Sequence, residues 1–189
     1  MLTAKPVDVP CLISREQLAK RVGELARQIS ADYQGKEPIV VGVLKGAFVF
    51  MSDLVRQLTI PVRFDFVKIS SYGDGTNTSG QITLHLDLSA PVAGQDVLVL
   101  EDIVDTGTSC CWLLEHLRQK QAASVKLCAL LDKASRRQTP VTIDYVGFSI
   151  PDRFVVGYGI DFAERHRNLP YVGYLPEEEE QRDAQRKNA

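Results

Sequence analysis

The chain has 189 residues, 44% of them apolar and 24% charged, which is typical of a single globular domain and excludes a disordered or fibrous chain. Its formal net charge of −2 gives no basic footprint for a nucleic-acid partner. No stretch approaches the roughly 18 apolar residues that span a bilayer, and the start MLTAKPVDVPCLIS lacks an apolar signal region, so we expect a cytoplasmic protein with no membrane partner.

The first predicted elements are a helix, a strand and a second helix. Ser14 and Gln17 have the spacing of a capping box, and apolar residues then recur at helical spacing, which predicts an amphipathic helix over 14–29. The continuous apolar run 38–44 predicts a strand that is buried on both faces, and residues 45–58 have helical character. Together they form one strand-loop-helix unit.

The middle of the chain repeats this alternation. Residues 62–70 alternate like a strand, and the polar segment 71–81 that follows predicts an extended loop. Residues 96–101 form a second buried strand, 110–120 a helix and 124–131 another strand. Two shorter strands are expected near the end of the chain, at 143–150 and 170–175. Buried strands that alternate with helices indicate an α/β domain with a mostly parallel sheet, whose ligands bind at the carboxyl ends of the strands.

The loop that follows the strand at 96–101 carries three carboxylates. Glu101 and Asp102 come where a hydrophobic strand leaves the core, and Asp105 follows. Adjacent acids there are unfavourable unless sugar hydroxyls or a hard cation such as Mg²⁺ satisfies them. Residues at the start of the next helix are suited to a phosphate, because the first helical amides are unpaired and glycine and hydroxyls permit close approach. They are Thr106, Gly107, Thr108 and Ser109.

Other interpretations of this segment are weaker. The loop lacks the GxxxxGK[ST] of a P-loop and the GxGxxG of a dinucleotide-binding fold, so an oxidoreductase of that kind is disfavoured. An ordinary strand-helix turn with Asp105 or Thr106 as N-cap explains a generic DTG, but not one that follows four apolar residues and two acids. His85, His116 and His166 are too widely spaced to indicate a metal centre.

The segment VLVLEDIVDTGTS at 97–109 is similar to the phosphoribosyl pyrophosphate (PRPP) signature of phosphoribosyltransferases, and residues from about 40 to 175 resemble the hypoxanthine-guanine branch. The resemblance implies that Glu101 and Asp102 bind the ribose hydroxyls and Mg²⁺. It also implies that residues 105–109 wrap the 5′-phosphate and that Asp105 accepts a proton near purine N7.

The resemblance also implies the type I phosphoribosyltransferase fold, in which helices flank the central sheet and a small hood is built from both ends of the chain. We expect a single domain over residues 1–176, with a core at about 36–150 and a hood from about 1–20 and 150–176. A charged tail, 177–189, follows.

Two further segments resemble the parts of the family that hold pyrophosphate and close the site. VLKGAFVFMSDL resembles the pyrophosphate loop, which implies a non-proline cis peptide between Leu44 and Lys45, with backbone amides at Gly46 turned toward pyrophosphate. Arg167 is expected to contact the same group. SSYGDGTNTSG resembles the mobile loop that closes over the site through Ser71 and Tyr72.

The purine-binding end is indicated by LLDKASRR and by IPDRFVVGYGIDFAERHRNLPYVGYL. Lys133 matches the lysine that donates to the purine 6-oxo group; an ammonium cannot accept a hydrogen bond, so it selects oxygen over the amino group of adenine. Phe154 is expected to stack on the base and Val155 to bind it through backbone groups. Asp161 is expected beside the base, and also at a second metal position.

The activity implied by the resemblance is the Mg²⁺-dependent transfer of the 5-phosphoribosyl group from PRPP to N9 of hypoxanthine or guanine, which forms IMP or GMP in purine salvage. A homodimer or homotetramer is expected. Two alternatives stay open: a regulator of the same fold that senses PRPP or nucleotides without turnover, and a xanthine-preferring enzyme. The sequence has Phe162 where the family often has tyrosine and His166 where another aromatic is frequent, which leaves the purine preference open.

Overall fold

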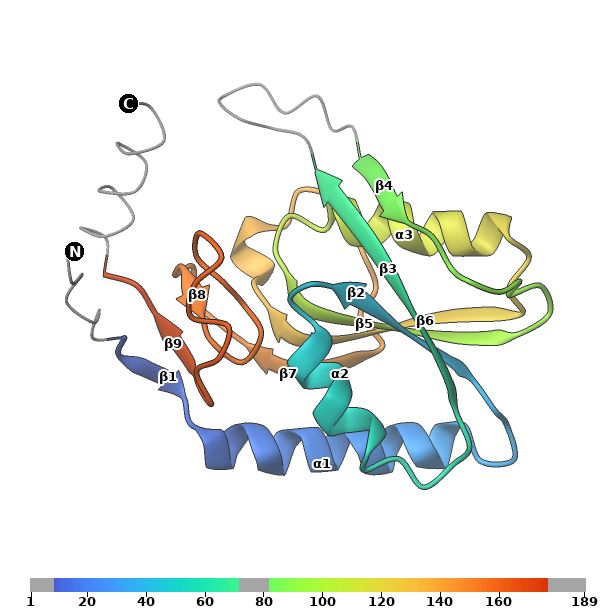
Figure 1. Cartoon of the computed structure of the whole chain (residues 1–189), viewed down its shortest axis with the longest axis horizontal. Helices are drawn as coiled ribbons and strands as arrows, with labels where there is room; N and C mark the ends of the chain where they lie inside the picture. The colour runs from blue at the N-terminus through green and yellow to red at the C-terminus, as the bar shows by residue number, and fades with distance from the viewer. Residues whose placement is uncertain (1–8, 72–81, 177–189) are drawn as a thin grey trace, which may run out of the picture.

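The protein, seen in a computed structural model that describes residues 9–71 and 82–176, is built on a six-stranded sheet (Figure 1). The strand order is β4-β3-β2-β5-β6-β7, and only the β3/β4 pair of this sheet is antiparallel. The strands are β2 (Ile39–Leu44), β3 (Arg63–Ser71), β4 (Ile82–Leu86), β5 (Asp96–Val104), β6 (Ser124–Asp132) and β7 (Tyr145–Ser149). The predicted α/β class with a mostly parallel sheet is confirmed.

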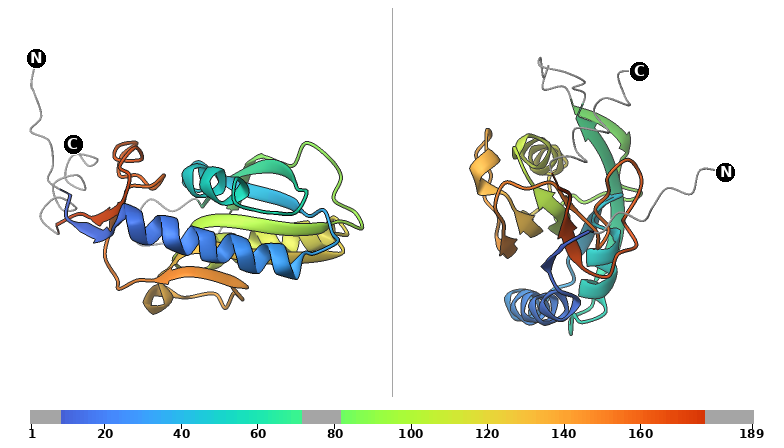
Figure 2. Two further views of the ribbon diagram at one scale, coloured as in Figure 1. Left: turned by 90° about the horizontal axis from the view of Figure 1, so that it is seen from below. Right: turned by 90° about the vertical axis from the view of Figure 1, so that its left-hand side faces the viewer.

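Helices cover both faces of this sheet (Figures 1 and 2). One face carries α1 (Arg15–Asp32) and α2 (Phe48–Val55), and the other carries α3 (Thr108–Gln119). The side chains of the central strands alternate between these layers: Val40 and Leu98 pack with α1 and α2, whereas Val41 and Val99 pack with α3. This two-sided burial explains why the central strands appear in the sequence as continuous apolar runs.

Helix α1 begins as its sequence predicts. Gln17 N donates to Ser14 Oγ at 3.3 Å, and Ser14 N donates to Gln17 Oε1 at 2.8 Å, so the capping box is complete. Leu18 and Val22 are among the apolar residues that the helix buries against the sheet and α2. The helix is therefore held by its first turn and by one apolar face.

A second, three-stranded antiparallel sheet joins the two ends of the described chain. It consists of β1 (Cys11–Ile13), β9 (Val172–Tyr174) and β8 (Val155–Val156), in that order. This sheet confirms the small hood made from N- and C-terminal segments. The bounds 1–20 and 150–176 for the hood, and 36–150 for the core, stay predictions. The tail at 177–189 lies outside the described residues.

Several elements differ from the expectations. Residues 45–47 form a turn, so α2 begins at Phe48 and is shorter than predicted, while β5 continues three residues past Glu101. Strands β1, β4 and β8 were not predicted. A short 3₁₀ helix, η1 (Ala134–Arg136), follows β6. Within the part of the chain that is described, no helix combines the length and apolar character needed to cross a membrane.

The order of the strands places a crevice between β2 and β5. From β2 the chain continues to its neighbour β3 on one side, and from β5 it continues to β6 on the other. The loops that leave the carboxyl ends of β2 and β5 therefore diverge, which is the arrangement that binds ligands in parallel α/β sheets.

Candidate active site

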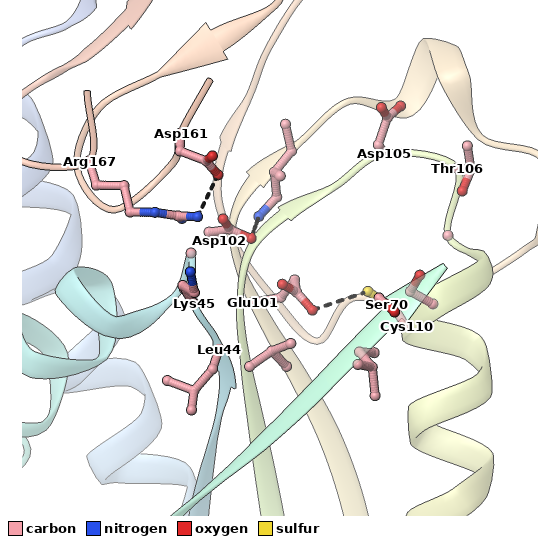
Figure 3. Close-up of a pocket in the computed structure, with 16 residues that line it drawn as sticks. Leu44, Lys45, Ser70, Glu101, Asp102, Asp105, Thr106, Cys110, Asp161 and Arg167 are labelled. Atoms are coloured by element: carbon pink, nitrogen blue, oxygen red, sulfur yellow. Dashed lines mark hydrogen bonds and ion pairs between the residues drawn. The ribbon is translucent and has the colours of Figure 1, made fainter. Parts of the chain in front are cut away.

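A cavity of about 540 Å³ lies at the carboxyl ends of β2 and β5 (Figure 3). It brings together most of the residues that the sequence predicts for ribose, phosphate, pyrophosphate and metal. These are Leu44, Lys45, Gly46, Glu101, Asp102, Asp105, Thr106, Gly107, Ser109, Asp161 and Arg167. Five further residues line it that were not predicted: Val43, Ile69, Ser70, Ile103 and Cys110.

Glu101 and Asp102 place two carboxylates at the floor of this cavity. Glu101 is only 8% exposed, and burial, together with the neighbouring Asp102 carboxylate, raises its pKa well above the usual range. Burial also raises the pKa of Asp102. Ile103 N donates to Asp102 Oδ1 at 2.8 Å, and Cys110 Sγ donates to Glu101 Oε2 at 3.8 Å. A cation or a set of hydroxyl donors in the cavity would stabilise the charged forms.

Gly46 makes room for one of these carboxylates. A Cβ at this position would lie 1.6 Å from Asp102 Oδ2, so the close approach of the turn after β2 to Asp102 requires glycine. The peptide bond between Leu44 and Lys45 is cis, as the resemblance implies. The turn after β2 therefore forms the wall of the cavity opposite the start of α3.

The phosphate loop runs from Asp105 into the first turn of α3. Gly107 is the N-cap, with φ of 86°, and a Cβ there would lie 2.4 Å from Thr139 O. Of the five predicted loop residues, Thr108 does not line the cavity; its Oγ1 lies 3.1 Å from Thr139 Oγ1 and it borders a separate groove along α3. Thr106 and Ser109 supply the hydroxyls that line the cavity.

Arg167 lies on the opposite side of the cavity, where it is held by the loop 159–167. Its Nη2 lies 2.7 Å from Asp161 Oδ1, and its Nη1 donates to Gly159 O at 2.9 Å. Its buried Nε has no partner among the described residues. The remaining Asp161 oxygen accepts from Glu164 N at 2.8 Å.

Glu164 is a site residue that the sequence did not predict. Its carboxylate accepts from Lys45 Nζ at 2.9 Å and lies 3.5 Å from Arg167 Nη2. The hydrogen bond from Lys45, with the nearby Arg167, lowers the pKa of Glu164. A sequence separation of 119 residues between Lys45 and Glu164 gives no local signal for this contact.

A second cavity, of about 390 Å³, contains two of the predicted purine-binding residues. Lys133 lines it with a side chain that is 6% exposed, and Nζ lies 3.7 Å from Asp152 Oδ1. Phe154 also lines it, 39% exposed, with its ring edge-to-face against Phe162 at 5.1 Å. Val155 is buried in β8 and does not line this cavity.

Arg136 connects the two cavities, and the sequence did not predict its role. It lines the second cavity, its Nη1 lies 3.8 Å from Asp152 Oδ1, and its Nε lies 3.4 Å from Asp105 Oδ1. Asp105, which lines the first cavity, therefore faces a cation of the second. The two cavities meet at this ion pair.

The predicted closing loop is described only at its edge. Ser71 ends β3, and Tyr72 lies outside the described residues. Ser70, which precedes them, lines the larger cavity.

The carboxylates of the larger cavity can supply part of the coordination shell of a hard cation. No group of three or more His, Cys, Asp or Glu side chains that could hold a metal ion exists within 9–71 and 82–176. Glu101 and Asp102 nevertheless offer buried carboxylate oxygens, the ligands that Mg²⁺ prefers, and Mg²⁺ commonly completes its shell with water and substrate oxygens. The donor set fits Mg²⁺ bound by one or two protein carboxylates together with a phosphorylated substrate.

Comparison with known proteins supports one family. Residues 13–163 match the family described as phosphoribosyl transferase domain. The hypoxanthine phosphoribosyltransferase of Haemophilus influenzae is 46% identical over 174 residues, which cover 90% of this chain and 97% of that protein. A crystal structure of a hypoxanthine phosphoribosyltransferase from Staphylococcus aureus superimposes with a TM-score of 0.87 at 41% identity, covering 90% of this chain and 94% of that one.

Some relatives are much longer. The bifunctional protein TilS/HprT of Listeria innocua is 48% identical over 167 residues, and the chain spans 26% of its length.

The fold and the cavities define a phosphoribosyltransferase domain. The chain belongs to the phosphoribosyltransferase family and, within it, to the hypoxanthine-guanine branch.

Proposed function

We propose that the protein transfers the 5-phosphoribosyl group of PRPP to N9 of hypoxanthine or guanine, releases pyrophosphate and forms IMP or GMP in purine salvage. The observation that carries this proposal is the junction of two cavities, one lined by carboxylates, hydroxyls and Arg167, the other by Lys133 and Phe154. The names of relatives that cover most of the chain, including the hypoxanthine-guanine phosphoribosyltransferase of Bacillus subtilis at 46% identity, support the same reaction.

The larger cavity supplies the groups that the PRPP half of the reaction requires. Glu101 and Asp102 bind the ribose hydroxyls, and the loop 105–109 binds the 5′-phosphate mainly through Thr106, Ser109 and helix-start amides. Lys45, Gly46 and Arg167 bind pyrophosphate, whose departure builds negative charge that two cations stabilise. The backbone at Leu44 helps to shape that wall.

Mg²⁺ is part of the proposal. Glu101 and Asp102 would hold it, with Asp161 at a second position after release from Arg167. When bound, the ion neutralises charge on the pyrophosphate and on the two buried carboxylates. The chain's own carboxylates orient the ribose beneath the departing group.

The smaller cavity supplies base selection. Lys133 donates to the 6-oxo group and Phe154 stacks on the ring. Val155, in β8, contributes backbone groups at the edge of the base, and Asp161 contributes from the larger cavity. As the C1–N9 bond forms and the C1–oxygen bond to pyrophosphate breaks, the purine loses a proton, which Asp105 accepts. Closure of the loop that includes Ser71 and Tyr72 would exclude water as a competing nucleophile.

A direct test is pyrophosphate release with PRPP, Mg²⁺ and each of hypoxanthine, guanine, xanthine and adenine. We expect turnover with hypoxanthine and guanine. No turnover with the three 6-oxopurines would contradict the enzyme and favour a PRPP-sensing regulator, and a preference for adenine would contradict the role of Lys133. A cytoplasmic location and a homodimeric or homotetrameric assembly belong to the same proposal; sedimentation of the whole chain tests the assembly.

A further inference from the structure

Glu164 bridges two cations that come from separate parts of the fold. Its Oε2 accepts from Lys45 Nζ at 2.9 Å, and its Oε1 lies 3.5 Å from Arg167 Nη2. Lys45 follows β2, whereas Arg167 belongs to the loop before β9. One carboxylate thus uses one oxygen for each cation, as two oxygens of a phosphate group would.

The loop that presents Glu164 is closely tied to the turn after β2. Ala163, Glu164 and His166 have φ of 50°, 62° and 71°, a left-handed conformation that non-glycine residues rarely adopt. Phe162 and Arg165 exchange backbone hydrogen bonds of 3.1 and 3.0 Å across this turn. The left-handed turn directs the Glu164 side chain back toward Lys45.

Contacts between backbones fix the distance between these two segments. A Cβ at Gly159, whose φ is 104°, would lie 2.2 Å from Gly46 O, so the start of the loop 159–167 packs directly on the turn after β2. Lys45 and Arg167 therefore stand on one continuous wall, with Glu164 between them.

Glu164 is held less firmly than Arg167. Lys45 and Glu164 side chains are 52% and 66% exposed, and exposed ion pairs are individually weak. Arg167 is 20% exposed and keeps its 2.7 Å contact with Asp161 and its 2.9 Å bond to Gly159 O without any help from Glu164. Removal of the Glu164 charge therefore leaves Arg167 in place, frees Lys45 and removes one of the two carboxylates that contact Arg167.

We infer that Glu164 is a positioning residue that competes with the pyrophosphate group for Lys45 and Arg167, and so weakens the binding of PRPP and pyrophosphate. The inference rests on the proposed function, which assigns these cations to pyrophosphate. A pyrophosphate, with its greater charge, displaces a single exposed carboxylate on binding, and the carboxylate returns when the product leaves. The competition favours product release.

The test compares Glu164→Gln with Glu115→Gln. Glu115 is an exposed residue of α3 whose carboxylate lies 3.8 Å from Arg118, so its substitution removes the same charge outside both cavities. Binding of inorganic pyrophosphate is measured by calorimetry at constant Mg²⁺, and binding of IMP, which has no pyrophosphate, is measured in parallel. We expect the Kd for pyrophosphate to fall about three- to tenfold in Glu164→Gln only, as two weak ion pairs predict, with the Kd for IMP unchanged.

The outcomes separate this inference from the proposed function. If wild type turns over hypoxanthine but Glu164→Gln binds pyrophosphate no more tightly than Glu115→Gln does, the competition is wrong and the enzyme assignment stands. If IMP binding also tightens, the effect is not specific to pyrophosphate and the inference fails as well. Failure of wild type to turn over any 6-oxopurine would instead overturn the proposed function. The two results are independent, because pyrophosphate binding is measured without turnover.

Discussion

The two cavities of the site are built in different ways. The larger one draws most of its carboxylates and hydroxyls from one continuous segment, 101–109, at the end of β5, and Ser70 and Asp161 add one of each from elsewhere. The smaller one combines Lys133 after β6 with Phe154 and Tyr174, which lie in or beside the hood strands. Functional residues that lie in one continuous segment can be recognised from the sequence. Those of a cavity assembled from distant segments are brought together only by packing. Substitutions in one cavity should therefore affect the binding of one substrate more than that of the other.

Asp105→Asn gives the largest expected effect, because Asp105 lines the first cavity and faces Arg136 of the second. Loss of the proton acceptor should lower kcat by about 10²- to 10⁴-fold, while the isosteric amide keeps the phosphate loop and PRPP affinity. Steady-state kinetics and equilibrium PRPP binding measure the two effects. An unchanged kcat would show that the proton goes elsewhere.

Gly46→Ala tests how closely the larger cavity is packed. The added Cβ would overlap Asp102 Oδ2, at 1.6 Å, and push that carboxylate out of position. Because the clash is with the end of a side chain, the chain should still fold, and kcat/KM for PRPP should fall about 100-fold. Kinetics and thermal unfolding together check this. Full activity with an unchanged Tm would mean that the position of Asp102 is not critical.

Lys133→Met should affect the purine and spare PRPP. Loss of a hydrogen bond from a buried charged donor should raise the KM for hypoxanthine about 10- to 100-fold. Lys20→Met, on an exposed position of α1, is the matched control. Base KM values and PRPP affinity are measured for both variants. A rise in the PRPP Kd equal to the rise in base KM would contradict the separation of the cavities.

Asp87→Asn should produce the smallest effect, through the anchoring of α3 beneath the larger cavity. Asp87 contacts Lys120 Nζ at 2.8 Å and His116 Nε2 at 3.2 Å. Burial raises its pKa, but hydrogen bonds from Lys120, the Leu88 amide and His116 outweigh burial and lower the pKa to about 2. Because the side chain is 35% exposed, we discount this shift to about 1 kcal/mol of stability at pH 7.

The sign of the Asp87 effect follows from the lowered pKa. The folded state binds the proton less readily than the unfolded state, so the stabilisation is present above the ordinary value of 3.8 and is lost as pH falls toward 2. The free energies of unfolding of wild type and Asp87→Asn, measured with urea, should differ by about 1 kcal/mol at pH 7 and converge below pH 3. A constant difference across that range would contradict the ionic origin.

Much of the fold could be predicted because its central strands are buried on both faces. β2 has no polar interruption, β5 and β6 contain the continuous apolar runs 97–100 and 127–131, and the Ser14 and Gln17 pattern marks the start of α1. Strands β1 and β8 have three and two residues, too few for a period to emerge. β4 was not predicted although Ile82, Leu84 and Leu86 alternate; its five residues directly follow the polar segment 71–81 and are too few for a clear period.

The site shows the same division. The sequence predicted the site residues of segment 101–109, and the structure brings most of them into one cavity. Thr108, at the start of α3, instead contacts Thr139 in a neighbouring loop. The bridges made by Glu164 and Arg136 were not predicted, because they join residues that only the folded sheet brings together. The sequence does not show which partner a charged residue in a surface loop will contact.

One competition reaction tests the proposed phosphoribosyl transfer and its base selection together. The whole chain is incubated with PRPP, Mg²⁺ and equal concentrations of hypoxanthine, guanine, xanthine and adenine, and the nucleoside monophosphates are separated by mass spectrometry. The proposed function predicts IMP and GMP as the main products, with AMP absent. Dominant AMP, or consumption of PRPP without any nucleotide, would contradict it.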